Sequence, residues 1–207
     1  RANRTDVFDE EQGFCDYTAI HLFGVTEDGR SVFAQVRGFR PYFYVAVPWD
    51  LGATSHWTEE YVRASGRDVA RTLKPYADAL VRFLKATGES HLRWMQPGSV
   101  RGVARIRLDG FTARRFAPFL RVEVANRTAV NKCVQALQRH EWDGTTVVRR
   151  GAGAIRCYES QVDPVMRFMH AHRLQPSGWV SLREFATIPI DQRQTTCQIE
   201  VDLQAGE

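Results

Sequence analysis

The stretch of sequence that decides the fold is Phe39-Arg40-Pro41-Tyr42-Phe43-Tyr44-Val45-Ala46-Val47. Its aromatic and β-branched residues are typical of a buried strand, and a proline on either side of the apolar run marks the limits of that strand. Because side chains alternate between the two faces of a sheet, Phe43 and Val45 are predicted to enter the core, while the two tyrosines beside Phe43 occupy the opposite face.

Beyond this strand, the hydrophobic pattern predicts a regular succession of elements. Apolar residues at helical spacing indicate one helix that begins near Pro75 and a second that begins near Asn126. Strands are predicted over residues 100–108, 119–124, 145–148 and 154–158. If one of the two short strands after the second helix closes the sheet, the order from Tyr42 to Tyr158 is βαββαβ, which predicts a ferredoxin-like core over residues 42–158.

The remaining residues complete an α+β chain. Residues 18–25 and 31–36 predict a β-hairpin joined by the turn Thr26-Glu27-Asp28-Gly29, inside an N-terminal region of residues 1–41. Asp163-Pro164 is predicted to open a helix, and residues 179–203 to hold two or three strands, inside a C-terminal segment of residues 159–207.

Charge is concentrated in the middle of the 207-residue chain. Residues 1–60 carry 5 basic and 10 acidic side chains, residues 61–156 carry 19 basic and 7 acidic, and residues 157–207 carry 4 basic and 7 acidic. The middle segment thus has a formal charge of +12, and 25 of the 28 cations in the chain are arginines. A dense arginine segment suits a polyanion, because guanidinium groups match phosphate and each neutralised phosphate releases a counterion.

Specific arginines can be proposed as phosphate contacts. Arg105 and Arg107 are two residues apart in a predicted strand and share one face of it, whereas Val103, Ile106 and Leu108 are its predicted core residues. The complete set of predicted nucleic-acid-binding residues, in which Tyr42 is a stacking partner for a base, is Arg40, Tyr42, Arg105, Arg107, Arg114, Arg115 and Arg121.

The residues offer little for catalysis or metal binding. Glu200 and Asp202 would share a strand face and could hold Mg²⁺, but we find no third carboxylate beside them and expect no metal site. No nucleophile–base set or Walker motif stands out, so no catalytic residue is predicted. The four cysteines contain no CxxC pair and are expected to be reduced thiols of an intracellular protein.

Two segments, Leu22-Phe23-Gly24-Val25-Thr26-Glu27-Asp28-Gly29 and Phe39-Arg40-Pro41-Tyr42-Phe43-Tyr44, resemble the N-terminal domain of family B DNA polymerases. The resemblance is to the delta-type branch, including its relatives in large DNA viruses. It continues, in the order of the family, at Pro118–Val122, Tyr158-Glu159-Ser160, Arg167-Phe168-Met169, Trp179 and Cys197–Asp202.

The resemblance implies a role that the residues alone do not show. In that family this domain precedes a 3′–5′ exonuclease domain and lines the path of the single-stranded template, and the D-I-E metal motif and the catalytic carboxylates lie further along the chain. The resemblance therefore implies DNA-templated nucleotidyl transfer with Mg²⁺ for a whole enzyme, no catalytic residue or cofactor in this segment, and single-stranded DNA and the downstream exonuclease and polymerase domains as partners. It also implies action in the nucleus or at a viral replication site.

Three alternatives remain open from the sequence. A free-standing RNA-binding module of the same βαββαβ order is one, because Arg37-Gly38-Phe39 and Tyr44 match part of an RNA-recognition signature, from which Arg40, Pro41 and Tyr42 depart. The second is a structural docking domain anchored by the aromatic side chains of Phe119, Trp142 or Trp179. The third is a small metal-dependent nuclease that uses Glu200 and Asp202.

The chain begins with Arg rather than Met and has no run of 18 apolar residues, so we expect a piece of a longer protein without a membrane-spanning helix.

Overall fold

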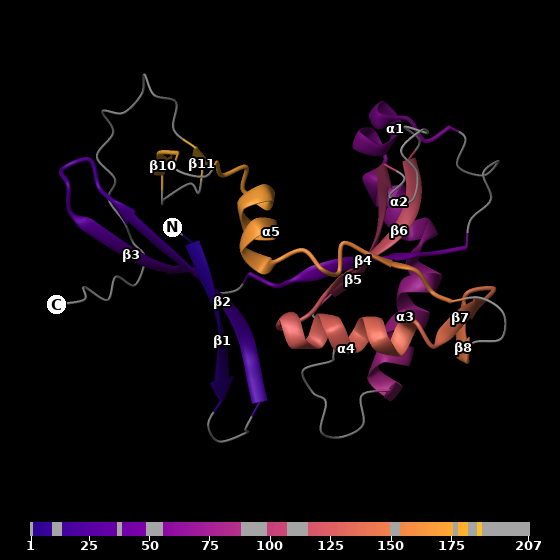
Figure 1. Cartoon of the computed structure of the whole chain (residues 1–207). Helices are drawn as coiled ribbons and strands as arrows, with labels where there is room; N and C mark the ends of the chain where they lie inside the picture. The colour runs from indigo at the N-terminus through magenta and orange to yellow at the C-terminus, as the bar shows by residue number, and fades with distance from the viewer. Residues whose placement is uncertain are drawn as a thin grey trace. The chain divides into compact units, whose positions relative to one another are not determined.

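The computed structural model describes residues 2–9, 14–36, 39–48, 56–87, 99–106, 116–149, 154–175, 178–181 and 186–187 (Figure 1). The chain divides into two compact units, one made of Arg1–Phe39 and Val162–Glu207 and the other of Arg40–Gln161. The sequence had suggested three segments, 1–41, 42–158 and 159–207. In the structure, residues of the first and third segments belong to the same unit.

The unit Arg40–Gln161 is built on a four-stranded antiparallel sheet. Its strands are β4 (Tyr42–Ala46), β5 (Ser99–Ile106), β6 (Phe116–Glu123) and β9 (Cys157–Tyr158). Their order across the sheet is β5-β6-β4-β9, so the first strand along the chain lies between the third and the fourth. All three neighbouring pairs are antiparallel. This is the split βαβ arrangement of a ferredoxin-like core, and the predicted α+β class is confirmed.

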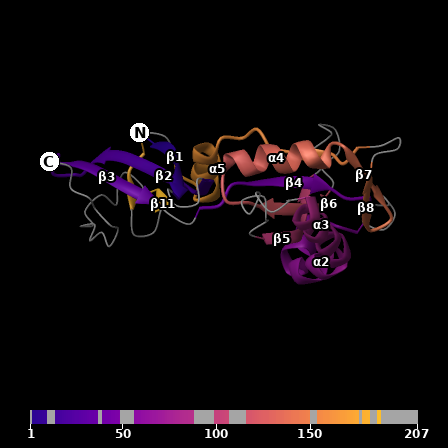
Figure 2. The same ribbon diagram turned by 90° about the horizontal axis from the view of Figure 1, so that it is seen from below.

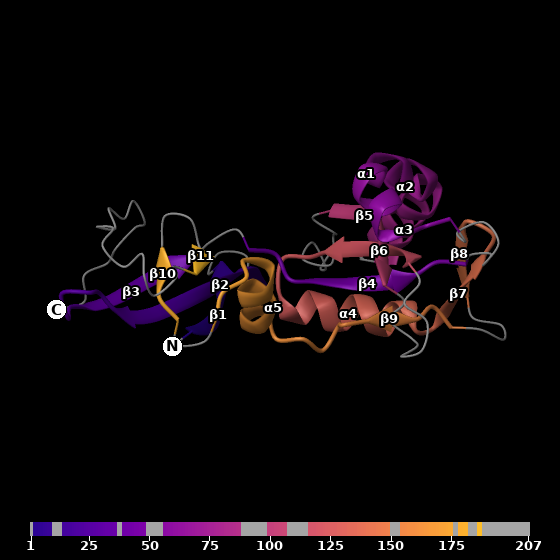
Figure 3. The same ribbon diagram turned by 90° about the horizontal axis from the view of Figure 1, so that it is seen from above.

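Helices fill the two crossovers of this sheet. The first crossover contains α1 (Glu59–Ala64), α2 (Gly66–Thr72) and α3 (Lys74–Thr87), and the second contains α4 (Arg127–Leu137), followed by a hairpin of β7 (His140–Asp143) and β8 (Thr146–Arg149). In both rotated views α4 runs along β4 (Figures 2 and 3). Asn126 caps α4, since its side-chain oxygen accepts a hydrogen bond of 2.9 Å from the Ala129 N–H.

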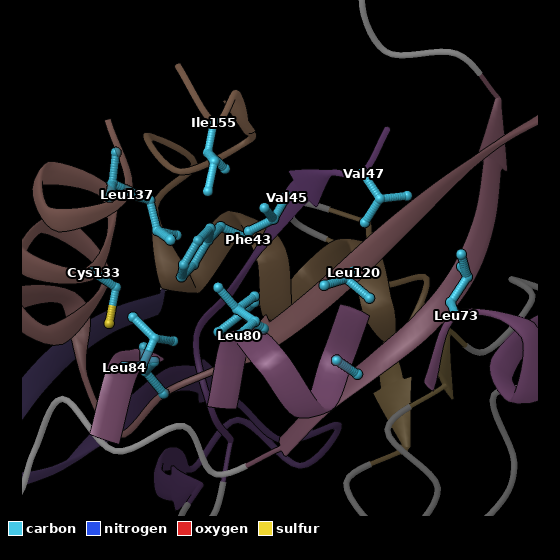
Figure 4. Packing of buried hydrophobic residues seen from close by; sticks show 14 of the residues in the cluster. Phe43, Val45, Val47, Leu73, Leu80, Leu84, Leu120, Cys133, Leu137 and Ile155 are labelled. Atoms are coloured by element: carbon cyan, nitrogen blue, oxygen red, sulfur yellow. The ribbon is translucent and has the colours of Figure 1, made fainter. Parts of the chain in front are cut away.

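The core of this unit lies between the sheet and its helices. Phe43 of β4, Leu120 of β6, Leu80 and Leu84 of α3 and Leu137 of α4 are fully buried and belong to one hydrophobic cluster. Figure 4 shows Phe43 between the side chains of α3 and α4. Full burial of each large apolar side chain stabilises the fold by about 1.5–3 kcal/mol. The prediction that Phe43 faces the core is confirmed.

Of the three predicted core residues of β5, Val103 was wrong, whereas the side chain of Ile106 and all of Leu108 lie outside the described part of the chain. Val100 and Ala104 pack against the core, and Gly102 between them faces the Leu73 side chain at the end of α2. Val103 is half-buried and lies on the other face of the strand, because neighbouring residues of a strand point to opposite faces. The glycine explains the error, since a core position without a side chain breaks the apolar alternation.

The β7–β8 hairpin was not expected as a unit of its own, although a strand near 145–148 was. It packs against α3 through Trp142, whose ring meets that of Tyr76 edge to face at 5.4 Å. The indole Nε1–H of Trp142 donates a hydrogen bond of 2.8 Å to the Ala46 carbonyl at the end of β4. The hairpin is thereby held against both α3 and the sheet.

The unit Arg1–Phe39 with Val162–Glu207 contains a three-stranded antiparallel sheet of β1 (Ala2–Asp9), β2 (Phe14–Val25) and β3 (Ser31–Val36). The predicted β2–β3 hairpin and its turn are confirmed, with Gly29 at φ 84°. The additional strand β1 was missed because Ala2–Asp9 lacks apolar alternation, and its backbone pairs with β2 with a register shift at Val7/Phe8.

The C-terminal part of the same unit begins with the predicted helix α5 (Pro164–Ala171), capped by Asp163. Phe168 of α5 is buried, and its ring meets the ring of Phe39 edge to face at 5.4 Å. A short pair of strands follows, β10 (Val180–Ser181) and β11 (Ala186–Thr187). Among the helices of the described residues, none is both long and apolar enough to cross a membrane.

Candidate nucleic-acid interface

The sheet face opposite the helices of the unit Arg40–Gln161 carries aromatic and arginine side chains. Tyr42 and Tyr44 alternate along β4 with residues that fill the core. Register places Arg121 of β6 opposite Tyr44, Arg101 of β5 opposite Arg121, and Phe119 of β6 opposite Ala46. We call the surface formed by Tyr42, Tyr44, Arg101, Phe119 and Arg121 the tyrosine–arginine face.

The aromatic rings of this face form a continuous row. Tyr42 and Tyr44 meet edge to face at 5.8 Å, Tyr44 meets Phe119 at 6.4 Å, and Phe119 meets Tyr158 of β9 at 5.7 Å. Edge-to-face contacts of this kind stabilise a packed cluster beyond the burial of area. Tyr42 is only 8% exposed, and Tyr44 and Phe119 are each 3% exposed. The row is therefore a closed support and not an open stacking platform.

Arg121 links this aromatic row to the charged part of the face. Its guanidinium carbon lies 3.7 Å from the centre of the Tyr42 ring, which is a cation–π contact. Its Nη2 atom lies 2.9 Å from the Glu123 carboxylate, and the Nη2 atom of Arg101 lies 3.9 Å from the same oxygen. A base that stacked on Tyr42 would have to displace the guanidinium group that already covers the ring.

The charge of this cluster is positive. One carboxylate, that of Glu123, faces two guanidinium groups, and the Arg101 side chain is 56% exposed whereas the Arg121 side chain is 25% exposed. The buried Nε of Arg121 has no hydrogen-bond partner in the described part of the chain. A phosphate oxygen could therefore bind Arg101 without breaking the shorter Arg121–Glu123 ion pair, and guanidinium groups suit such contacts.

The structure describes part of the predicted binding set. Tyr42 and Arg121 are brought into direct contact, and Arg40 is exposed just before β4. Arg105 lies on β5, where its backbone pairs with Ala117. The predicted residues Arg107, Arg114 and Arg115 lie outside the described residues.

Arg101 was missed by the sequence analysis, although a signal for it was present. Arg101 precedes Arg105 by four residues and Arg107 by six. Because side chains repeat every two residues along a strand, the three arginines are expected on the same face. The prediction assigned phosphate contacts from Arg105 onward, and the extension of the same alternation toward the start of β5 would have included Arg101.

The described residues were predicted to hold neither a metal site nor a catalytic nucleophile. Among the described residues, no group of three or more histidine, cysteine or acidic side chains is placed to hold a metal ion, and Glu200 and Asp202 lie outside those residues. Burial raises the pKa of the Cys133 thiol to about 12, and burial together with the neighbouring Cys133 raises that of Cys157 to about 12. Both groups are therefore protonated, weak nucleophiles at neutral pH.

The chain was compared with known proteins. No family model matches it. It is 26% identical over 182 residues to a DNA polymerase of Pyramimonas orientalis virus, with 88% of this chain and 13% of the relative aligned. It is also 26% identical over 187 residues to the DNA polymerase delta catalytic subunit of rice (Oryza sativa subsp. japonica), with 88% of this chain and 15% of that protein aligned. The chain thus spans less than one sixth of the length of these relatives.

A solved structure has a similar fold. It is the family B DNA polymerase from the archaeon Pyrobaculum calidifontis, which matches 86% of this chain and 16% of its own with a TM-score of 0.50 at 21% identity. The chain is thus similar in sequence to DNA polymerases and similar in fold to part of a family B DNA polymerase. The similar sequences include DNA polymerase delta catalytic subunits and viral DNA polymerases, in agreement with the resemblance found in the sequence.

Proposed function

We propose that this chain is the N-terminal, non-catalytic domain of a replicative family B DNA polymerase, and that it guides the single-stranded template and braces the 3′–5′ exonuclease domain. The whole enzyme would perform DNA-templated nucleotidyl transfer with Mg²⁺, using carboxylates outside this chain. Such an enzyme would act in the nucleus or at a viral replication site. The similarity to delta catalytic subunits over 88% of the chain supports this proposal.

The observation that carries the template contact is the arginine cluster on the tyrosine–arginine face. Arg101 is exposed beside the packed aromatic row, and Arg40 is exposed at the entry to β4. Both residues lie in the unit that contains the +12 segment. A phosphate backbone that crossed the face would bind the exposed guanidinium groups, while the rings beneath hold the strands that position them.

The proposal predicts salt-dependent binding of single-stranded DNA. Fluorescence anisotropy of a labelled oligothymidylate should show an affinity that falls steeply as salt rises, because phosphate contacts release counterions. Arg40→Ala and Arg101→Ala should each weaken binding and lower the slope of log affinity against log salt by about 0.7, the value for one phosphate of a single strand. An affinity that does not change with salt would exclude a phosphate-dominated contact.

Arg82→Ala is the matched control. Arg82 is an exposed arginine on α3, about half a helical turn away from the buried Leu80 and Leu84 side of that helix. Its removal should leave both affinity and slope unchanged if the tyrosine–arginine face makes the contact. Circular dichroism of each variant checks that the fold is retained, and a loss that is equal in all three variants would contradict a localised contact.

A structural docking role is the second candidate, and the closed aromatic row favours it. Of the three predicted anchors, Phe119 is buried within the row, Trp142 is held by Ala46 and Tyr76, and Trp179 is 37% exposed. If the chain binds no nucleic acid at low salt, docking is the better account. If it binds matched RNA more tightly than DNA, the RNA-binding alternative is favoured, because the 2′-hydroxyl distinguishes the two.

A further inference from the structure

A second surface of the unit Arg40–Gln161 has the composition of a nucleic-acid contact. This surface is the outer face of α4, whose opposite side packs into the core through Val130, Cys133 and Leu137. Six residues of α4 and its C-terminal turn are exposed, namely Thr128, Asn131, Lys132, Gln135, Gln138 and Arg139. At 100° per residue these six positions fall within an arc of about 120°. We call them the α4 stripe.

The α4 stripe contains no carboxylate. It combines two cations with carboxamide and hydroxyl groups, and α4 as a whole carries no acidic residue. The outer face of α3 differs, because its Lys74 is bound at 2.7 Å to Asp78 on the same helix. Lysine, arginine, asparagine, glutamine and threonine are the side chains that bind phosphate oxygens and base edges.

The spacing of the cations fits a nucleic-acid strand. Lys132 and Arg139 are seven residues apart, which is about 10 Å along a helix axis, and a stacked strand rises about 3.4 Å per nucleotide. The two cations therefore span about three nucleotides, with Gln135 between them. A third cation, the exposed Arg149, lies close to the end of the stripe, since Arg149 pairs in register with His140, the residue that follows Arg139.

Neighbouring interactions hold the stripe in place. At its start, the Arg127 guanidinium group donates hydrogen bonds to the Ser160 carbonyl and, at 2.8 Å, to the Gln161 side chain. At its end, His140 is in contact with Phe83 of α3 at a ring distance of 4.4 Å, and its carbonyl accepts a hydrogen bond from the Ile155 N–H. Helix-terminal stabilisation accounts for a cation at Arg139, but Lys132 lies almost two turns earlier and is outside its range.

We propose that the α4 stripe binds the sugar–phosphate backbone of a nucleic-acid strand, as a second contact surface that is separate from the tyrosine–arginine face. The charge complementarity of an acid-free row to phosphate identifies the partner. This contact is independent of the template path across the tyrosine–arginine face, because its cations lie on α4, its C-terminal turn and β8.

The test uses the same 207-residue chain with labelled single-stranded DNA and with RNA of matched sequence. Lys132→Ala combined with Arg139→Ala should weaken binding several-fold and lower the salt slope by about 1.4 for two single-strand phosphates. Gln135→Glu should also weaken binding, because it introduces a carboxylate of almost the same shape between the cations. Alanine and glutamate are good helix formers, so all three exposed substitutions should leave the fold intact.

Gln175→Glu is the control for net charge, because Gln175 is exposed and lies outside α4. It should have a much smaller effect than Gln135→Glu. Loss in both the DNA and the RNA arms supports a backbone contact, and loss in one arm alone supports the site and identifies the strand it takes. Binding that is equal in wild type and in both stripe variants would overturn the proposal. These results are distinguishable from those on Arg101 of the tyrosine–arginine face and on Arg40 just before β4.

Discussion

The four-stranded and the three-stranded sheets of this molecule differ in how far their apolar residues are buried. In the unit Arg40–Gln161, β4 and β6 are covered by helices, and Phe43 and Leu120 are fully buried. In the other unit, Ile20 near the middle of β2 is buried, but Phe23 and Val25 toward its end are 45% and 63% exposed. Phe43 is thus part of a two-layer core, whereas the end of β2 is held largely by pairing with β3.

The aromatic side chains show the same difference. On the β2–β3 hairpin, His21, Phe23 and Phe33 contact one another, with Phe33 at 5.2 Å from each of the other two rings. These three side chains stay half-buried or exposed. On the tyrosine–arginine face the rings are almost completely covered. Rings that make similar contacts therefore differ in how far they are removed from water, and it is this burial that supplies most of their stabilisation.

The largest expected effect comes from cutting into the two-layer core. Phe43→Ala should lower the free energy of unfolding by about 3–5 kcal/mol, because the fully buried ring leaves a cavity between α3 and α4. Phe33→Ala removes a half-buried ring from the hairpin and should cost only about 1–2 kcal/mol. Urea denaturation followed by circular dichroism measures both. Equal losses would show that the two sheets do not differ in how strongly their rings stabilise the fold.

Glycine substitutions sharpen the comparison at the level of single atoms. A Cβ added at Gly102 of β5 would lie 2.4 Å from the Cβ of Leu73, which cannot rotate away, so Gly102→Ala should destabilise the chain by about 1–3 kcal/mol. At Gly24 of β2, nothing lies within 4 Å of the added atom. Gly24→Ala should therefore be neutral or slightly stabilising, since alanine lowers the entropy of the unfolded chain. A clear loss of stability at Gly24 would show that this end of β2 is packed after all.

The same residues show what could be predicted from the sequence. The alternation around Phe43 and the helical spacing after Pro75 identified the ferredoxin-like core, because amphipathic periodicity reflects burial on one side of an element. The position of Val103 was mispredicted, because Gly102 beside it is a core position without a side chain, whose fit depends on Leu73 at the end of α2, 29 positions earlier in the chain. The strand β1 pairs with β2 through its backbone, and such pairing has no signature in side-chain pattern.

The candidate site could be predicted in part for similar reasons. Charge density indicated a polyanion contact, and the strand pattern placed Tyr42 and Arg121 in the predicted binding set. Their direct contact and the ion pair with Glu123 come from strand register, which joins residues almost 80 positions apart. The α4 stripe could not be identified from the sequence, because the exposed side of α4 has to be known before its residues can be recognised as one row without carboxylates.

Helix capping offers a test of intermediate size. Asn126 is 1% exposed and caps α4, whereas Asp163 caps α5 from an exposed position, with its side chain accepting a hydrogen bond of 2.8 Å from the Val165 N–H. Asn126→Ala should cost about 1–2 kcal/mol, and Asp163→Ala about 0.5–1 kcal/mol, because the buried N–H of Ala129 would lose its partner without access to water. Thermal unfolding of the two variants side by side measures the difference. A larger loss at Asp163 would reverse the ranking of the two units.

The smallest effect is expected at the exposed end of the β2–β3 hairpin, in its turn. The hydroxyl group of Thr26 donates a hydrogen bond to Asp28, and Arg30 Nε lies 2.7 Å from the same carboxylate. The Thr26 hydrogen bond first, and the charge of Arg30 second, lower the pKa of Asp28 below its ordinary value.

A lowered pKa means that the folded state favours the ionised carboxylate. The stabilisation is therefore complete above the pKa of Asp28 in the unfolded chain and is lost as the pH falls through the lower pKa of the folded state. Thr26→Val keeps the shape of the side chain but removes the hydroxyl, so it should raise the pKa of Asp28 more than Arg30→Gln does. Carboxyl chemical shifts followed by NMR between about pH 2 and pH 6 report both values.

Because an exposed ion pair is screened by salt and a hydrogen bond much less so, added salt should raise the pKa of Asp28 in wild type and in Thr26→Val, but hardly in Arg30→Gln. A Thr26→Val variant with an unchanged pKa would show that the hydroxyl does not hold this turn.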